Sequence, residues 1–169
     1  MRILLSVGLS GLMAAPSLAA DMEISIDIPK LDVAEYHKPY VAIWLEGPDK
    51  KVAANLAVWY DVANRKQEGD KWLKDLRQWW RRTGRELKVP ADGLTSATRA
   101  PGSHTIKFED SAALKDLASG QYELVVEAAR EVGGREVLRI PLQWPPKEGT
   151  SLNAKGEHEL GTVAVNVKP

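Results

Sequence analysis

The residues best suited to chemistry lie in one short stretch, residues 92–102, which reads Asp-Gly-Leu-Thr-Ser-Ala-Thr-Arg-Ala-Pro-Gly. Three hydroxyl side chains, Thr95, Ser96 and Thr98, lie there among small residues. This composition predicts an exposed turn whose backbone another molecule can approach closely. An accessible hydroxyl with small neighbours can accept a covalent group, and Asp92 could position the turn. The alternative is an ordinary turn in which Asp92 and Thr95 form local hydrogen bonds with the backbone.

Part of this stretch resembles the motif Asp-x-x-(Ser/Thr)-Gly-Ala-Thr, at which FMN transferases attach FMN to the last Thr through a phosphoester bond. Ser96 stands where the motif has Gly, a residue that adopts backbone conformations serine rarely adopts. The resemblance implies that Thr98 carries covalent FMN. The implied cofactor-binding residues are those of the motif and the arginine that follows it: Asp92, Thr95, Ser96, Ala97, Thr98 and Arg99.

A basic region surrounds this stretch in the sequence and consists of five arginines: Arg77, Arg81, Arg82, Arg85 and Arg99. Their guanidinium groups could hold a flavin phosphate or dock an acidic redox partner. A solvated helix face is the simpler interpretation of the same residues. Over the whole chain, 23 Lys and Arg residues balance 23 Asp and Glu residues, which argues against a nucleic-acid-binding protein.

The other candidates for chemistry form weaker patterns. The three histidines, His37, His104 and His158, have no metal-ligand spacing, so we expect surface residues and no metal site. Ser103 and His104 lack the nucleophile-elbow pattern that would accompany a hydrolase triad. The absence of cysteine excludes disulfides, thiolate metal sites, Fe–S clusters and c-type haem attachment. We therefore expect no catalytic residues.

The N-terminal residues have the pattern of a secretory signal peptide. A positive charge, an apolar run and small residues at a cleavage site follow one another in residues 1–19. We expect cleavage after Ala19, with Ala20 as the near alternative, which leaves residues 20–169 as one periplasmic domain. The apolar run is too short for a comfortable membrane anchor, and no later stretch reaches the required length. The protein is therefore expected to be exported and not membrane-embedded, and a cysteine-free chain fits a bacterial periplasm.

Alternating polar and apolar residues predict strands on both sides of the candidate loop. Residues 39–60 predict a β-hairpin, and residues 121–144 predict a second one around Gly133 and Gly134. Further strands are expected at residues 23–28, 104–108 and 160–167, and a loop at residues 147–157.

Between the first hairpin and the candidate loop, the apolar residues recur at spacings of three and four: Trp72, Leu73, Leu76, Trp79 and Trp80. This period predicts an amphipathic helix with Asp70 as its N-cap and an end near Gly84. We expect the helix to pack as an insertion over an edge or end of the sheets. The segment at residues 111–118 is expected to be helical or irregular.

Six tryptophans are many for a chain of this length. Trp44, Trp59 and Trp144 are expected to fill the core, and the three in the helix to attach it to the sheets. The alternative is a stacking platform for an isoalloxazine ring or a haem face. Because Trp79 and Trp80 are adjacent, they cannot share one helix face, and one of them is expected near the loop surface.

These elements predict a mainly β fold: an immunoglobulin-like antiparallel β-sandwich with one inserted Trp-rich amphipathic helix. Seven or eight short strands with regularly spaced turns are typical of that class. An open β-barrel is the alternative.

The order of four segments resembles a family of predicted periplasmic proteins, domain of unknown function 2271. The segments are residues 39–46, 72–80, 95–102 and 122–130. The resemblance spans nearly all of the mature chain. Members of this family tend to be encoded beside PepSY-type membrane proteins and FMN transferases, which implies a role in flavin and extracytosolic electron transfer. The resemblance supplies no catalytic residues.

We therefore expect a periplasmic, flavin-carrying electron-transfer accessory protein with FMN attached to Thr98. Its expected partners are an FMN transferase and a PepSY-type membrane flavoprotein. In this interpretation the protein is modified by an enzyme and is not itself one. The alternative is a cofactor-free periplasmic binding or scaffold module that docks a membrane partner through its helix and exposed aromatic and Arg residues.

Overall fold

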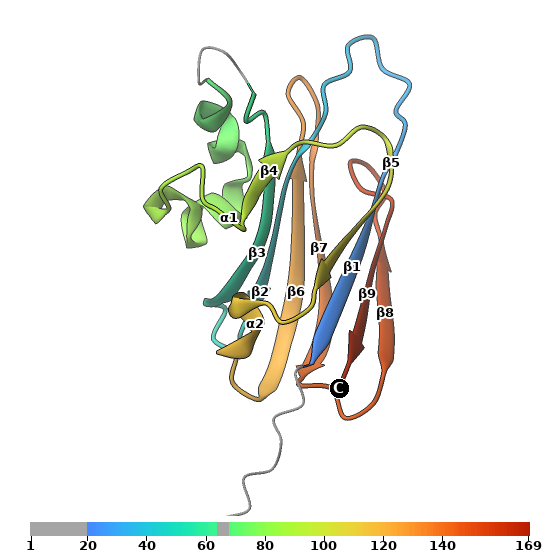
Figure 1. Ribbon diagram of the computed structural model, residues 1–169. Helices are drawn as coiled ribbons and strands as arrows, with labels where there is room; N and C mark the ends of the chain where they lie inside the picture. The colour runs from blue at the N-terminus through green and yellow to red at the C-terminus, as the bar shows by residue number, and fades with distance from the viewer. Residues whose placement is uncertain (1–19, 64–67) are drawn as a thin grey trace, which may run out of the picture.

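Two β-sheets form the architecture of the protein, as shown by a computed structural model that describes residues 20–63 and 68–169 (Figure 1). One sheet has four strands and the other five, and few residues are helical. Each sheet has its own hydrogen-bond ladder, which is consistent with the predicted β-sandwich and differs from the closed ladder of a barrel. The predicted signal peptide, residues 1–19, lies outside the described residues.

The four-stranded sheet has the strand order β5–β1–β9–β8. Its strands are β1 (Asp21–Ile28), β5 (Gly102–Phe108), β8 (Thr150–Lys155) and β9 (Thr162–Lys168). Every second residue of β1 is buried, as its alternating sequence predicts. β8 corrects the prediction of a loop at residues 147–157. Its mostly polar sequence hides the alternation, but Leu152 and Ala154 pack against the core while β8 pairs with β9.

The five-stranded sheet has the strand order β4–β3–β2–β6–β7. Its strands are β2 (Tyr40–Glu46), β3 (Val52–Tyr60), β4 (Thr95–Ala97), β6 (Gly120–Ala129) and β7 (Arg135–Trp144). The pairs β2–β3 and β6–β7 are the two predicted antiparallel hairpins. All residues of β2 from Val41 to Glu46 are buried, so this central strand is covered on both faces.

The helical segment, residues 69–86, covers the outer face of the five-stranded sheet (Figure 1). It consists of three short pieces, which corrects the prediction of one continuous helix: η1 (Gly69–Asp75), α1 (Arg77–Arg82) and η2 (Gly84–Glu86). Asp70 is not the N-cap, because it lies inside η1 after the cap residue Glu68. A further short helix, α2 (Ala112–Lys115), lies where helical or irregular structure is predicted.

A buried carboxylate causes the break between η1 and α1. Leu76 leaves the helical region with a ψ of 71°. The next free N–H groups, those of Gln78 and Trp79, donate to the carboxylate of Glu127 from β6, at 3.1 and 2.8 Å. Glu127 therefore caps α1 from a neighbouring strand, and a continuous helix would leave this buried carboxylate without these donors.

Two hydrophobic cores result from this arrangement. The inner core lies between the sheets and contains Trp59 and Trp144, as predicted. Trp44 is predicted for the same core, but it lies in the outer core, together with Trp79 of α1. Since side chains alternate along a strand and the neighbours of Trp44 in β2 point inward, Trp44 points outward under the helical segment.

Candidate functional site

The motif stretch does not form a simple exposed turn, which corrects the sequence prediction. Thr95, Ser96 and Ala97 form β4, a short edge strand that pairs in parallel with the end of β3. The N–H of Thr98 continues the pairing by donating to the carbonyl of Tyr60 at 3.0 Å. Three small residues carry no recognisable alternation, so only the pairing with β3 reveals the strand.

The turn before β4 contains Asp92 and Gly93, and Thr95, the first residue of β4, closes it. The hydroxyl of Thr95 accepts a hydrogen bond from the N–H of Ala91 and donates to its carbonyl, both at 3.0 Å. Gly93 has a positive φ of 73°, a conformation that favours glycine. Asp92 is exposed beside it. These local hydrogen bonds are those that the alternative of an ordinary turn predicts for Thr95, and they make Thr95 a positioning residue for β4.

Thr98 follows β4 directly and is half-buried. Its hydroxyl donates to the carbonyl of Pro39 at 2.5 Å, which ties the motif stretch to the segment that precedes β2. Pro39 is 59 residues away in the sequence. The candidate acceptor hydroxyl is therefore already oriented by the fold, and only the tertiary structure brings the two segments together.

Arg99 has different neighbours from Arg81 and Arg82 of the predicted basic region. Its guanidinium carbon lies 5.1 Å from the centroid of the Trp59 ring, and its Nη2 lies 3.4 Å from the hydroxyl of Ser96. His104 packs against the same indole, with ring centroids 6.0 Å apart. Arg81 and Arg82, by contrast, line a cavity together with Gln78 and Arg139. The basic region of the sequence thus divides into separate sites.

A cavity of about 280 Å³ opens beside the Thr98 side chain. Residues from five parts of the chain line it: His37, Lys38, Tyr40, Asp61, Trp72, Asp75, Thr98, Ala129 and Glu131. We call this the Thr98 cavity. Of the six predicted cofactor-binding residues, Thr98 is the one in its lining. The other five shape the backbone before Thr98 or contact Trp59.

The Thr98 cavity has one exposed aromatic wall. Trp72 is 46% exposed, whereas Trp79 is fully buried and Trp80 is partly buried. The expectation that all three attach the helical segment is therefore wrong for Trp72. Lys74 lies over its indole, with Nζ 5.8 Å from the ring centroid. Helical spacing alone cannot separate Trp72 from its buried neighbours, because η1 and α1 do not share one helical phase.

The polar residues of the Thr98 cavity are one lysine, Lys38, three carboxylates, Asp61, Asp75 and Glu131, and the side chains of His37, Tyr40 and Thr98. His37 places Nε2 at 2.8 Å from a Glu35 carboxylate oxygen and Nδ1 at 3.5 Å from that of Glu131. Burial raises the pKa of Tyr40, and the nearby charges of Asp61 and Glu131 raise it further against the opposing effect of a backbone hydrogen bond. Tyr40 therefore keeps its proton at neutral pH, and its hydroxyl donates to the carbonyl of Gly69 at 3.0 Å.

His37 and Tyr40 were missed as site residues by sequence reasoning. Each is a single polar or aromatic residue, His37 just before and Tyr40 near the start of a predicted strand, with no spacing that relates it to Thr98. The exposed position of Trp72 was also unpredictable. The hydrogen bond between Thr98 and Pro39 is the structural signal that joins these residues into one site.

A comparison with protein families identifies the family to which this chain belongs. The model of the family described as "Predicted periplasmic protein (DUF2271)" matches residues 21–162. The chain belongs to this family. The match runs from β1 to the start of β9 and includes the motif stretch, the helical segment and every residue of the Thr98 cavity. Comparisons with curated proteins and with solved structures gave no match.

Membership of this family confirms the predicted periplasmic location. No helix within residues 20–63 and 68–169 is long and apolar enough to cross a membrane. In the same residues, no group of three or more His, Cys, Asp and Glu side chains is arranged to hold a metal ion. The candidate chemistry of this family member lies in the Thr98 cavity and in the charged side chains around the helical segment.

Proposed function

We propose that this family member carries one FMN, attached covalently to Thr98, and acts as a periplasmic electron-transfer accessory protein. The single observation that supports this best is the position of Thr98. Its side chain lines a cavity that also presents an exposed indole, although the motif and that indole come from different segments of the chain. A hydroxyl beside an aromatic wall suits a ligand with a phosphate at one end and a flat ring system at the other.

The aromatic part of the Thr98 cavity fits the isoalloxazine ring, whereas three carboxylates of its lining, Asp61, Asp75 and Glu131, outnumber Lys38. Trp72 offers its indole for stacking on the isoalloxazine ring. The Tyr40 hydroxyl at the cavity wall is neutral and donates its proton to the Gly69 carbonyl, so its oxygen can accept a hydrogen bond from the ligand. Lys38, which is exposed in the lining, is the lysine that can pair with the negative charge of a phosphodiester on Thr98. When bound, FMN would supply the electron-transfer chemistry, and the chain would supply position and surroundings.

Attachment needs an activated donor, such as the pyrophosphate-linked FAD. Thr98 Oγ1 would form a bond to the phosphorus of the FMN moiety, the pyrophosphate bond of the donor would break, and AMP would leave. The hydroxyl proton would pass to a base of the transferase. Because the esterified oxygen no longer donates, the Thr98–Pro39 hydrogen bond is lost on attachment. Either Thr98 rotates or the segment before β2 moves away from it.

The experiment is the intact mass of the mature protein after co-expression with an FMN transferase in a bacterial periplasm. We expect the mass of one FMN less water in the wild type and no increase in Thr98→Ala. Ser96→Gly is the matched control, because it restores the motif glycine and leaves Thr98 in place, and we expect full modification there. Circular dichroism checks that Thr98→Ala is folded.

Two results would contradict the proposal. One is an unmodified wild type in cells where a known acceptor protein is modified by the same transferase. The other is undiminished modification of Thr98→Ala. In either case the alternative, a cofactor-free binding or scaffold module that docks a membrane partner, becomes the leading function. The exposed Trp72 and the exposed arginines of α1 would then be its contact residues.

We further propose a PepSY-type membrane flavoprotein as the redox partner, and an immunoglobulin-like type for the sandwich. The partner is supported by the resemblance to a family encoded beside such proteins. The sandwich type is supported by two hairpins in the five-stranded sheet and by the antiparallel pairing throughout the four-stranded sheet.

A further inference from the structure

A second candidate site lies on the same outer face as the helical segment, at the other end of β2. Thr98 contacts Pro39, just before β2 begins, whereas Arg82 and Arg139 contact Glu46, the last residue of β2. Six residue steps along an extended strand separate these ends by about 20 Å. A cavity of about 500 Å³ is found there, which we call the arginine cleft and which is lined by Gln78, Arg81, Arg82 and Arg139.

The arginine cleft rests on a fully buried carboxylate. Glu46 accepts hydrogen bonds from the Trp44 indole N–H at 3.0 Å and from Arg139 Nη1 at 2.7 Å. Arg82 Nε lies 3.4 Å from Glu46 Oε1, and another nitrogen of the Arg82 guanidinium donates to the carbonyl of Lys50. Glu46 of β2 therefore fixes the positions of both guanidinium groups from the sheet side of the cleft.

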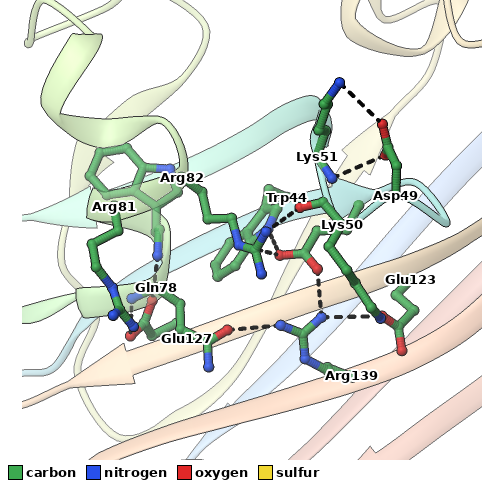
Figure 2. Close-up of polar contacts among 12 residues, drawn as sticks. Trp44, Asp49, Lys50, Lys51, Gln78, Arg81, Arg82, Glu123, Glu127 and Arg139 are labelled. Atoms are coloured by element: carbon green, nitrogen blue, oxygen red, sulfur yellow. Dashed lines mark hydrogen bonds and ion pairs between the residues drawn. The ribbon is translucent and has the colours of Figure 1, made fainter.

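Arg139 is held on both sides. Its Nη2 donates to the side-chain oxygen of Gln78 at 2.8 Å, and its Nη1 lies 3.2 Å from a Glu123 carboxylate oxygen. Figure 2 shows Arg139 between these two residues, with Lys50 meeting Glu123 at the far side. Burial alone would lower the pKa of Arg139, but the hydrogen bonds and charges of Glu46 and Glu123 outweigh burial and raise it. Arg139 thus stays charged.

The charges in and around the cleft do not cancel. Four cationic side chains, Arg81, Arg82, Arg139 and Lys50, face two carboxylates, Glu46 and Glu123, which leaves two positive charges. Arg81 is the clearest source of the excess. It is exposed, its Nε donates to the carbonyl of Arg77 at 3.1 Å, and it forms no ion pair with any residue that the structure describes.

A purely structural role accounts for only part of this arrangement. A buried carboxylate such as Glu46 needs a cationic partner, and Arg139 and Arg82 meet that need. The same need does not explain Arg81, nor a hollow that is lined by three guanidinium groups. Planar guanidinium groups are suited to paired hydrogen bonds with carboxylate and phosphate oxygens.

We propose that the arginine cleft binds a small, multiply charged oxyanion, either a phosphate group or a polycarboxylate. Arg82 and Arg139 form a floor that is oriented before the ligand arrives, and Arg81 closes on the ligand from α1. A preformed, concave site with a net positive charge favours a compact anion over the flat surface of an acidic protein. This site is independent of flavin attachment at Thr98.

The test is isothermal titration calorimetry of the full mature protein at low ionic strength, with inorganic phosphate and with citrate as separate probes. We expect saturable binding of at least one probe. Arg81→Gln should weaken it by about tenfold or more, since it removes one charge-assisted contact. Arg85→Gln is the matched control. Arg85 is an exposed arginine of η2 outside the cleft lining, and its removal should leave the affinity unchanged.

The two probes separate the possible ligands. Binding of phosphate alone assigns the cleft to phosphate groups, and binding of citrate alone assigns it to polycarboxylates. Because Arg81 belongs to none of the buried ion pairs, Arg81→Gln is expected to keep its fold and its thermal melting temperature. Absence of binding to both probes would overturn the proposal and leave a surface for an acidic macromolecule. Equal weakening by Arg81→Gln and Arg85→Gln would also overturn it, because that result means diffuse attraction.

Discussion

The outer face of the four-stranded sheet meets solvent, whereas the outer face of the five-stranded sheet lies under the helical segment (Figure 1). On the first face, polar side chains pair on the surface, as Ser25 does with Thr105 and Lys107 with Glu23. On the second face, Trp44 and Trp79 form a hydrophobic core and Glu46 and Glu127 are fully buried.

The comparison shows how burial under the helical segment changes the role of a carboxylate. A carboxylate on the solvent-exposed face can exchange its ion-pair partner for water at little cost in free energy. It therefore does not hold that partner in a fixed position. A carboxylate under the helical segment must keep its donors, because desolvation without them is costly. Glu127 therefore holds the start of α1, and Glu46 holds Arg139 and Arg82. Both candidate sites lie at the margins of this covered face.

The largest loss in the free energy of unfolding is expected for Trp79→Ala, on the covered face. The side chain is fully buried, and its indole N–H donates to the Asn55 side chain at 3.0 Å. A Cβ on Gly84 would come within 2.5 Å of the Trp79 ring, which shows how tightly this ring is packed. Trp79→Ala should reduce the free energy of unfolding by about 3–5 kcal/mol. Urea denaturation measures this change.

The matched control on the open face is Thr105→Ala. It removes the exposed 2.9 Å hydrogen bond to Ser25 and should change the free energy of unfolding by less than about 0.5 kcal/mol. Similar values for the two variants would mean that the helical segment adds little to stability, and the contrast between the faces would be lost.

A smaller effect is expected from Glu127→Gln, compared with Glu23→Gln on the open face. The first change removes the charge that receives the N–H groups of α1 and the Arg135 side chain, so we expect a loss of about 2–3 kcal/mol. The second breaks an exposed ion pair at 3.7 Å and should cost less than about 1 kcal/mol. Urea denaturation measures both, and helical circular dichroism should fall for Glu127→Gln alone.

The smallest effect concerns pH and Glu123, at the edge of the arginine cleft. The hydrogen bond from Lys50 and the charge of Arg139 lower the pKa of Glu123 despite partial burial. Its ionised form therefore stabilises the fold above the ordinary glutamate pKa of about 4.3, and this contribution is lost as the pH falls through the lowered value. Glu123→Gln should make the unfolding free energy less dependent on pH in this acidic range. Parallel pH profiles for wild type and variant would contradict this role.

The sequence by itself determined the elements whose signals are local. Alternation predicted β1, β9 and both hairpins, because one buried face imposes a period of two on a strand. The expectation that three tryptophans fill the core was confirmed for Trp59 and Trp144, which lie in the inner core, whereas Trp44 lies in the outer core. The resemblance to the periplasmic family, carried by four segments in order, was confirmed over residues 21–162.

Only the tertiary structure decided the features that depend on a partner distant in the chain. β4 exists because β3 offers it a free edge, and β8 exists because it pairs with β9. Glu127 interrupts the predicted helix from a strand about fifty residues away, as its hydrogen bonds to Gln78 and Trp79 show. Local propensity cannot contain such information, since it sums over neighbours in sequence and not in space.

The two candidate sites follow the same division. The motif residues around Thr98 are visible in the sequence, but the hydrogen bond to Pro39 and the exposed wall of Trp72 are not. The arginines of α1 are visible as a basic run, but Arg139 and the buried Glu46 that orients it come from other strands. The sequence determined which side chains were present, and burial under the helical segment decided which of them were held in place.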